Sequence, residues 1–281
     1  LVPFALRRGM FLTRLALALA AAAFLLVYAP AWPSPAPEAE ADLSLLQWNI
    51  YVGAVEPPDL QAALAQYQPD VVTLQEADLA QLAADAELAA LYPYRIVDPA
   101  QTAPSLAILS RYPIVESGVP AAEESIWDMP RVVWARLDVG GRSLLLVNAH
   151  PIPPRTFSDD CPLLRCYNSG PRDEQIAELR RLVGELRRPG EPLLVAGDMN
   201  VTEREPAYFD LAAGLRDAHR EAGAGFGASW RPGALKLPLG LIRIDYIFSD
   251  AGARAVALET DCGWRSSDHC LLFGRFALEE S

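Results

Sequence analysis

Short apolar segments recur along most of this 281-residue chain, and they constrain its fold more than any other feature. Residues 43–50 and 71–75 have the length and composition of buried strands, and helical periodicity follows each of them, at 58–67 and 79–91. Farther on, strand-like segments predominate, at 105–110, 114–117, 132–139, 143–148, 192–196, 242–248, 254–258 and 271–276. A further helical pattern covers 172–187. Two sheets with helices packed outside them, an α/β fold, are the economical arrangement of such elements.

Length and composition are those of a globular protein. Apolar residues make up 51% of the chain and charged residues 21%, which excludes disordered and fibrous classes. A body of roughly 250 residues buries close to three-quarters of its unfolded surface, so its core needs neither a metal nor disulfides. A bound metal would therefore serve chemistry. The net charge of −12 argues against a protein held to nucleic acid mainly by a basic face.

The first 31 residues have the layout of an export signal. Three arginines precede an uncharged apolar run at 15–29, and Ala29-Pro30-Ala31 offers small residues where a signal peptidase would cut. Because the run is shorter than the roughly 20 residues that span a bilayer, a cleaved signal is favoured and an uncleaved anchor is the alternative. We therefore expect an exported protein that is secreted, periplasmic, or anchored to the outer face of the cytoplasmic membrane.

A proline-rich linker at 32–41 follows this signal peptide or membrane anchor of residues 1–31. Its prolines and two glutamates are typical of a stiff, solvated spacer. The catalytic domain is expected at 42–281. Without residues 1–31, which hold three arginines and no acids, the net charge would change from −12 to −15.

The chain has four cysteines, an even number in a protein expected to be exported, where disulfides persist. We predict the local pairs Cys161–Cys166 and Cys262–Cys270, because each closes a short loop and the pairs lie far apart in the sequence. A zinc site is the weaker alternative. The cysteine spacings are not those of zinc knuckles, and His269 is the sole histidine near either pair.

Polar side chains stand at or just beyond the ends of the predicted strands. Asn49 closes the first strand and Glu76 follows the second. Similar groups recur later, at His150, Asp198, Asn200, Asp245, Asp268 and His269. Each alone could be a turn former or a helix cap, but loops at strand ends can gather such groups around one pocket. The third histidine, His219, lies in a charged helical stretch and is expected at the solvated surface.

Taken together and in this order, the motifs resemble the endonuclease/exonuclease/phosphatase superfamily over residues 42–278. Segments 109–114 and 172–175 also fall where that family often has a strand turn and a helix start. The resemblance implies a four-layered α/β sandwich, with two packed, mainly antiparallel β-sheets flanked by helices. It also implies hydrolysis of a phosphate ester with Mg²⁺ or Mn²⁺. Segment 225–230 is most similar to that of bacterial members with an N-terminal membrane segment.

Roles for individual residues follow from the same resemblance. Hard cations prefer oxygen ligands, and the implied metal ligands are Asn49, Glu76 and Asp268. The implied catalytic residues are His150, Asp198, Asn200, Asp245 and His269. Asp245 would pair with His269, and either Asp198 or His269 would act as general base. The implied substrate-binding residues are Arg111, Tyr167, Arg172 and Trp230.

The substrate is the least constrained part of this interpretation. We expect a monomeric phosphodiesterase or nuclease acting outside the cytoplasm on a phosphate ester, with nucleic acid and a membrane surface as possible partners. A phospholipid or sugar-phosphate hydrolase is the alternative, and a non-catalytic binding module the remote one. The loops at 151–171 and 229–243 carry several basic and aromatic residues, as phosphate and base binding require. The second loop is also apolar, as a packed lid or a lipid-facing surface would be.

Overall fold

The computed structural model describes residues 11–28, 40–51, 57–97, 106–120, 132–155, 167–232, 239–264 and 266–279. Within these residues the strands form two six-stranded sheets. The first sheet consists, in spatial order, of β11 (Ala253–Asp261), β12 (Leu271–Leu278), β1 (Leu43–Asn49), β2 (Val71–Gln75), β4 (Ala107–Ser110) and β3 (Tyr94–Ile96). Strands β1 and β2 are parallel, and the other neighbours in this sheet are antiparallel.

The second sheet repeats this plan. It consists of β5 (Ile114–Gly118), β6 (Val132–Val139), β7 (Arg142–Ala149), β8 (Leu193–Asp198), β10 (Asp245–Ser249) and β9 (Arg216–Asp217). Strands β7 and β8 form its parallel pair, and the remaining neighbours are antiparallel. The expected mainly antiparallel sheets are therefore confirmed.

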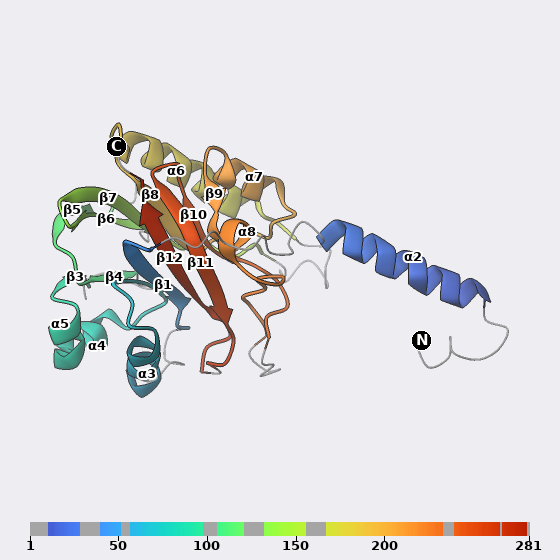
Figure 1. Cartoon of the computed structure of the whole chain (residues 1–281), viewed down its shortest axis with the longest axis horizontal. Coiled ribbons are helices and arrows are strands. Elements are labelled where there is room, and N and C mark those ends of the chain that lie inside the picture. The colour runs from blue at the N-terminus through green and yellow to red at the C-terminus, as the bar shows by residue number, and fades with distance from the viewer. Residues whose placement is uncertain are drawn as a thin grey trace.

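Helices cover the outer faces of both sheets (Figure 1). The first sheet is covered by α3 (Pro57–Tyr67), α4 (Leu79–Ala84) and α5 (Ala86–Leu91). The second is covered by α6 (Gly170–Leu186) and α7 (Pro206–Ala212), and the short α8 (Ala218–Ala222) lies against β10 and β11. A third apolar cluster, drawn from both sheets, fills the space between them. This arrangement confirms the predicted four-layered sandwich.

The layer between the sheets is apolar at one end and polar at the other. Strand side chains alternate between the two faces, so Leu43 and Leu45 share the inner face of β1 with Gln47 and Asn49. The same change from apolar to polar occurs on β8, where the inner-face residues Leu194 and Ala196 precede Asp198. Polar groups from both sheets therefore meet at one end of the sandwich, where they could form a site.

One predicted helix is two helices in the structure. The expected helix at 79–91 breaks at Asp85, which has an extended backbone. The Asp85 side chain accepts hydrogen bonds from the backbone N–H groups of Glu87 and Leu88, and so caps α5. Aspartate competes well at such caps because its carboxylate satisfies amides that a helix leaves unpaired. The predicted strand at 242–248 also begins later, at Asp245.

The expectation that His219 is solvated is wrong. His219 is 5% exposed, and its Nε2 atom lies 3.1 Å from the carbonyl oxygen of Gly225. Asp217, at the start of this stretch, is buried as well, whereas the side chain of Arg220 is 40% exposed. Arg243 forms an ion pair with the buried Asp217 and contacts Glu203 at 3.0 Å. The charges therefore pair with one another, and the histidine packs beside them as a buried ring.

Helix α2 (Phe11–Tyr28) covers most of the predicted apolar run and extends away from the sandwich (Figure 1). Among the residues that the structure places, no helix is long and apolar enough to cross a membrane. Of the predicted disulfides, Cys262–Cys270 is present, with the two Cα atoms 4.3 Å apart. Cys161 and Cys166 lie outside the described residues.

Candidate active site

The strand register brings the polar strand ends together. Asn49 is level with Gln75 in the parallel pair β1–β2, so Glu76 directly follows at the same edge. In the second sheet Ala149 is level with Gly197, which places His150 beside Asp198. Asp245, the first residue of β10, is the register partner of Asp198. The parallel pair of each sheet thus contributes its carboxyl ends to one site.

Gly197 allows the close approach of β7 and β8 at this edge. Its φ is +148°, and a Cβ atom built there would lie 1.9 Å from the carbonyl oxygen of Ala149. Glycine is therefore required immediately before Asp198. Two strand-end residues that carry side chains, Glu76 and Asn200, also have left-handed backbones, with φ of 52° and 50°. Such conformations cost free energy and often accompany functional sites.

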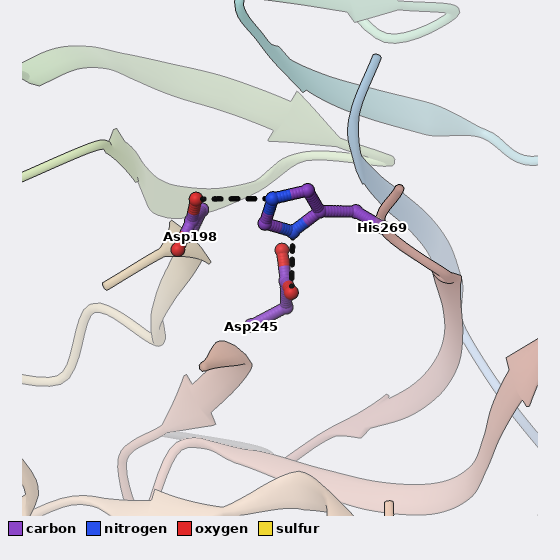
Figure 2. A group of neighbouring side chains, drawn as sticks. All are labelled: Asp198, Asp245 and His269. Atoms are coloured by element: carbon purple, nitrogen blue, oxygen red, sulfur yellow. Dashed lines mark hydrogen bonds and ion pairs between the residues drawn. The ribbon is translucent and has the colours of Figure 1, made fainter. Parts of the chain in front are cut away.

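The imidazole of His269 lies between two buried carboxylates (Figure 2). Its Nδ1 atom is 2.9 Å from Oδ2 of Asp245, and its Nε2 atom is 3.6 Å from Oδ2 of Asp198. The Oγ atom of Ser229 donates a second hydrogen bond to Oδ2 of Asp245, at 2.6 Å. Asp245 therefore fixes the plane of the ring and directs Nε2 toward Asp198.

Electrostatics assign different protonation states to these groups. Burial alone would raise the pKa of Asp198, but the charge of His269 and a hydrogen bond from His150 hold it below its ordinary value. Burial and the charge of Asp198 raise the pKa of Asp245. Burial opposes the charged imidazole, but Asp245, Asp198 and Asp268 outweigh it and raise the pKa of His269 to about 10. At neutral pH the proton shared with Asp245 therefore lies on the ring, next to an ionised Asp198.

Three further residues, His150, Asn49 and Glu76, lie close to Asp198. The Nε2 atom of the buried His150 is 3.4 Å from Oδ2 of Asp198 and 3.7 Å from Oε1 of Glu76. The Nδ2 atom of Asn49 donates to the same two carboxylates, at 3.0 Å and 3.1 Å. The Oδ1 atom of Asn49 accepts the backbone N–H of Tyr51. The amide nitrogen, rather than the predicted ligand oxygen, thus faces the carboxylates.

Asp268 belongs to the loop that also carries His269. Its Oδ2 atom accepts a hydrogen bond from the indole Nε1 of Trp230, at 3.0 Å. Its Oδ1 atom is buried and has no hydrogen-bond partner among the described residues. The neighbouring Ser267 holds the loop against β1, because its Oγ donates to the carbonyl oxygen of Asn49 at 2.7 Å. The Cys262–Cys270 disulfide closes the same loop at its base.

The donor set suits a hard divalent cation. Four carboxylates, Glu76, Asp198, Asp245 and Asp268, surround two histidines, so the site carries an excess of negative charge. Glu76, a quarter exposed at its side chain, and Asp268 offer oxygen ligands. The Oδ1 atom of Asp268 accepts no hydrogen bond in the described structure and lies 4.0 Å from Nε2 of His269. Asp198, Asp245 and His269 also place ligand atoms within 4.8 Å of one another. A protonated imidazole has no free lone pair, so that triad fits proton chemistry better than metal binding.

The predicted substrate-binding residues occupy different environments. Arg172 is buried, and its Nη1 atom donates to the carbonyl oxygen of Asn200 at 2.8 Å. Its other nitrogens bond to Asp173 and Glu205, and the hydroxyl of the half-exposed Tyr167 bonds to the same Glu205. Arg172 therefore holds the backbone at Asn200 in place through its carbonyl oxygen. The Nδ2 atom of Asn200 bonds to the Pro151 carbonyl oxygen at 2.9 Å.

Arg111 is not brought to this site. Its backbone N–H bonds to the carbonyl oxygen of Asp70, the residue that precedes β2. Glu76 follows β2 at the other end, so the length of the strand separates Arg111 from the carboxylates. The guanidinium instead lies over the ring of Tyr92, 5.6 Å from its centroid. The structure therefore places Arg111 away from the pocket, contrary to its predicted substrate-binding role.

Sequence reasoning missed three supporting residues. Gln47 and Gln75 are completely buried, and Ser229 donates to Asp245. An amide inside an otherwise apolar strand is a usable signal, because a buried polar group needs a partner. Ser229 gave no such signal, since serine is ordinary in a loop.

The buried carboxylate–imidazole arrangement lies at one end of a two-sheet sandwich, and the comparisons with known proteins assign a chain of this fold to one family. The sequence model of the endonuclease/exonuclease/phosphatase family matches residues 46–269, and the chain belongs to this family. Its members hydrolyse phosphate esters and generally depend on divalent metals. No functionally curated protein sequence matches the chain significantly.

Solved structures show the same fold at low identity. Humanized TDP2 from D. rerio is 22% identical, over 84% of this chain and 98% of that chain, with a TM-score of 0.64. A mannosyl-6-phosphatase from Bacteroides thetaiotaomicron is 15% identical over 84% and 100%, with a TM-score of 0.61. The human Nocturnin catalytic domain is 17% identical over 84% and 94%, also with a TM-score of 0.61.

Proposed function

We propose that this protein is a divalent-metal-dependent hydrolase of phosphodiesters that acts outside the cytoplasm. The observation that carries the proposal is His269 held between Asp245 and Asp198, with Asp198 also contacting His150. In-line attack on phosphorus requires a proton acceptor for water and positive charge near the phosphoryl oxygens. The protonation states derived above supply both within one buried cluster.

Each of these side chains has a defined part in the reaction. The ionised Asp198 accepts the proton of the attacking water, since the protonated His269 cannot. The His269 imidazolium and the amide of Asn200 bind non-bridging oxygens of the phosphate. His150, whose Nε2 contacts the same Oδ2 atom of Asp198 as His269 does, assists the leaving oxygen. Asp245 does not touch substrate and keeps the imidazolium charged and oriented.

Glu76 and Asp268 would hold the divalent cation, with Mg²⁺ or Mn²⁺ as the expected ion. When bound, such a cation supplies charge neutralisation at the phosphate and lowers the cost of forming hydroxide. Trp230 holds the Asp268 carboxylate through Oδ2, and Oδ1, which accepts no hydrogen bond in the described structure, lies 4.0 Å from Nε2 of His269.

A lipid or sugar phosphate is a second candidate substrate, and the placement of the basic residues favours it. Of the three basic residues in the loop at 229–243, Lys236 lies outside the described residues and the two arginines are buried. Arg231 packs against the carbonyl oxygens of Trp264 and Ser267. Arg243 is buried against Asp217. Neither guanidinium is exposed for nucleic-acid phosphates, whereas Leu239, Leu241 and Ile242 in the same loop are exposed apolar residues. One structural neighbour is itself a mannosyl-6-phosphatase, and another is TDP2 complexed with a single-strand DNA product.

A four-substrate assay separates these candidates. The full chain is incubated with Mn²⁺ and plasmid DNA, RNA, a lipid phosphodiester in vesicles, or a small phosphomonoester. Nicking of DNA or cleavage of RNA supports the nuclease. Turnover confined to the lipid or the monoester transfers the proposal to the second candidate. Binding without turnover of any of the four contradicts the enzyme proposal and favours the non-catalytic binding module.

Two observations support an extracytoplasmic location. The arginines and the apolar run at the N-terminus have the order of an export signal. The Cys262–Cys270 disulfide is a bond that persists in oxidising compartments. Cell fractionation of an epitope-tagged chain tests this location, and recovery of the oxidised protein from the cytoplasm would contradict it.

A further inference from the structure

A chain of three buried side-chain amides crosses the interior of the sandwich and ends on Asp245. It begins at Asn148 on β7, whose Nδ2 donates to the carbonyl oxygens of Leu74 and Ala107, each at 2.9 Å. The Oδ1 atom of Asn148 accepts from Nε2 of Gln75 at 2.7 Å. The Oε1 atom of Gln75 accepts from Nε2 of Gln47 at 2.7 Å. Gln47 also donates to Oδ1 of Asp245, at 3.2 Å.

The backbone determines the direction of this amide chain. Two carbonyl oxygens face Asn148, so its amide must turn the NH₂ group toward them and the oxygen toward Gln75. Gln75 must then present its NH₂ group to Asn148 and its oxygen to Gln47. Gln47 is consequently oriented with its NH₂ group toward both Gln75 and Asp245. If the Gln47 amide were reversed, its Oε1 atom would face two other acceptor oxygens, Oε1 of Gln75 and Oδ1 of Asp245.

Gln47 receives no other support in the described structure. All three amide residues are completely buried, and the Oε1 atom of Gln47 has no hydrogen-bond partner there. An unpartnered buried amide oxygen costs free energy, so the side chain is not placed here for stability alone. Its Nε2 atom provides the hydrogen bond to Oδ1 of Asp245, the oxygen that neither Ser229 nor His269 contacts.

We propose that Gln47 is a positioning residue, which fixes the Asp245 carboxylate through Oδ1 and thereby orients His269. The inference rests on the proposed function for its kinetic consequence but not for its structural one. With Gln47 in place, Asp245 accepts hydrogen bonds at both oxygens and cannot rotate about its Cβ–Cγ bond without losing one. Without it, Oδ1 is a buried acceptor with no donor in the described structure, and the carboxylate is held at Oδ2 alone, by Ser229 and His269.

The chain offers a matched control on the neighbouring strand. Thr73 is the register partner of Gln47 on β2 and is also completely buried, but its Oγ1 has no hydrogen-bond partner in the described residues. Thr73→Val therefore removes an equally buried polar group from the position next to Gln47 and leaves the hydrogen bonds of the amide chain intact. Gln47→Met removes the amide at similar length, and Gln47→Glu keeps its shape but replaces the donor with an oxygen.

The first experiment compares kcat and KM of the wild type and these three variants of the full chain, on the substrate that the wild type cleaves. We expect Gln47→Met to lower kcat roughly tenfold while KM stays within about twofold, as loss of a support behind a catalytic group does. Gln47→Glu should lower kcat further, and Thr73→Val should leave it unchanged. Equal losses in Gln47→Met and Thr73→Val, or unchanged kcat in both Gln47 variants, overturn the proposal.

Proton NMR provides a test that needs no turnover. The Nδ1 proton of His269, held by Asp245, should give a low-field imidazole signal that disappears in His269→Gln. We expect this signal in the wild type and in Thr73→Val, and its loss or broadening in Gln47→Met. An unchanged signal in Gln47→Met contradicts the proposal, whatever the activity. If the signal behaves as expected but the wild type cleaves none of the four substrates, the proposed function is refuted and the positioning role of Gln47 is not.

If neither Gln47 variant folds, the wild type still tests the inference. Both side-chain N–H protons of Gln47 should exchange slowly with solvent in ¹⁵N-labelled protein, since one bonds to Gln75 and the other to Asp245. Exchange of either proton at the rate of an exposed glutamine would overturn the assignment.

Discussion

Asp198 and Asp245 are register partners on neighbouring strands, both buried, and their pKa values move in opposite directions. The difference comes from their surroundings. Asp198 faces two histidines, and the positive charge of His269 keeps it ionised. Asp245 is buried to a similar extent, and both burial and the charge of Asp198 disfavour its ionisation. Carboxylates separated in this way take different roles, here proton acceptor and ring orienter.

Gly197→Ala tests the close approach that positions Asp198. The new methyl group would overlap the carbonyl oxygen of Ala149, so β7 and β8 must separate at the site. We expect the free energy of unfolding to fall by at least about 3 kcal/mol and activity to be lost. Gly184→Ala is the control, because this exposed glycine of α6 has open space around it. It should raise stability by about 0.5–1 kcal/mol in urea unfolding. A Gly197→Ala protein as stable as the wild type would contradict the structure.

Arg172→Lys tests the support beneath Asn200. A lysine ammonium cannot reproduce the planar set of bonds to Asp173, Glu205 and the Asn200 carbonyl oxygen. We expect kcat to fall roughly tenfold and the Tm to decrease. Arg181→Lys, on the same helix but exposed, should change stability by less than about 0.5 kcal/mol. Equal effects of the two substitutions would show that Arg172 is an ordinary surface arginine.

The buried His219 predicts a loss of stability in mild acid. Burial, with a further contribution from the charge of Arg243, lowers the pKa of His219 below its ordinary 6.5. The unfolded chain therefore binds a proton at higher pH than the folded one, and stability falls as pH drops below about 6.5. We expect a decrease of at most about 1.4 kcal/mol per pH unit from this group. It is measured as the difference between the wild type and His219→Gln in urea unfolding at pH 8 and pH 5.5, because the raised pKa of His269 adds stability over part of the same interval in both proteins. His219→Gln should lose less stability over the same interval, and an identical loss would exclude this role.

The Cys262–Cys270 disulfide predicts a link between redox state and activity. It closes the loop that carries Asp268 and His269. Replacing both cysteines by serine should lower the free energy of unfolding by about 2.5 kcal/mol, through the entropy of a short loop. It should also reduce kcat, because the loop can then move away from Asn49. Substitution is preferable to a reductant, since a reductant acts on every disulfide of the chain. Unchanged kcat in the double serine variant would show that the disulfide does not contribute to the geometry of the site.

Much of the fold and part of the site could be predicted from the sequence. Apolar strands that end in polar residues indicated that Asn49, Glu76 and Asp198 could gather around one pocket, because loops at strand ends bring such groups together. The sequence did not indicate that they come from the parallel pairs of two different sheets. Burial of His219 depends on Asp217 and Arg243 pairing with each other, which spacing along the chain does not indicate. The prediction for Arg111 is wrong for a related reason, since the position of a motif in the chain does not show where the side chain of one of its residues points. The amide chain from Asn148 to Asp245 requires the register of both sheets.

The central claim is that Glu76 and His269 belong to one metal-dependent phosphodiesterase site. The most direct measurement is hydrolysis of a generic activated phosphodiester by the full chain, by Glu76→Ala and by His269→Ala, each with Mn²⁺ and with chelator. We predict turnover by the wild type with metal alone, and none by either variant although both retain the wild-type circular dichroism spectrum. Turnover that survives chelation, or a folded variant with near-normal turnover, would contradict the account.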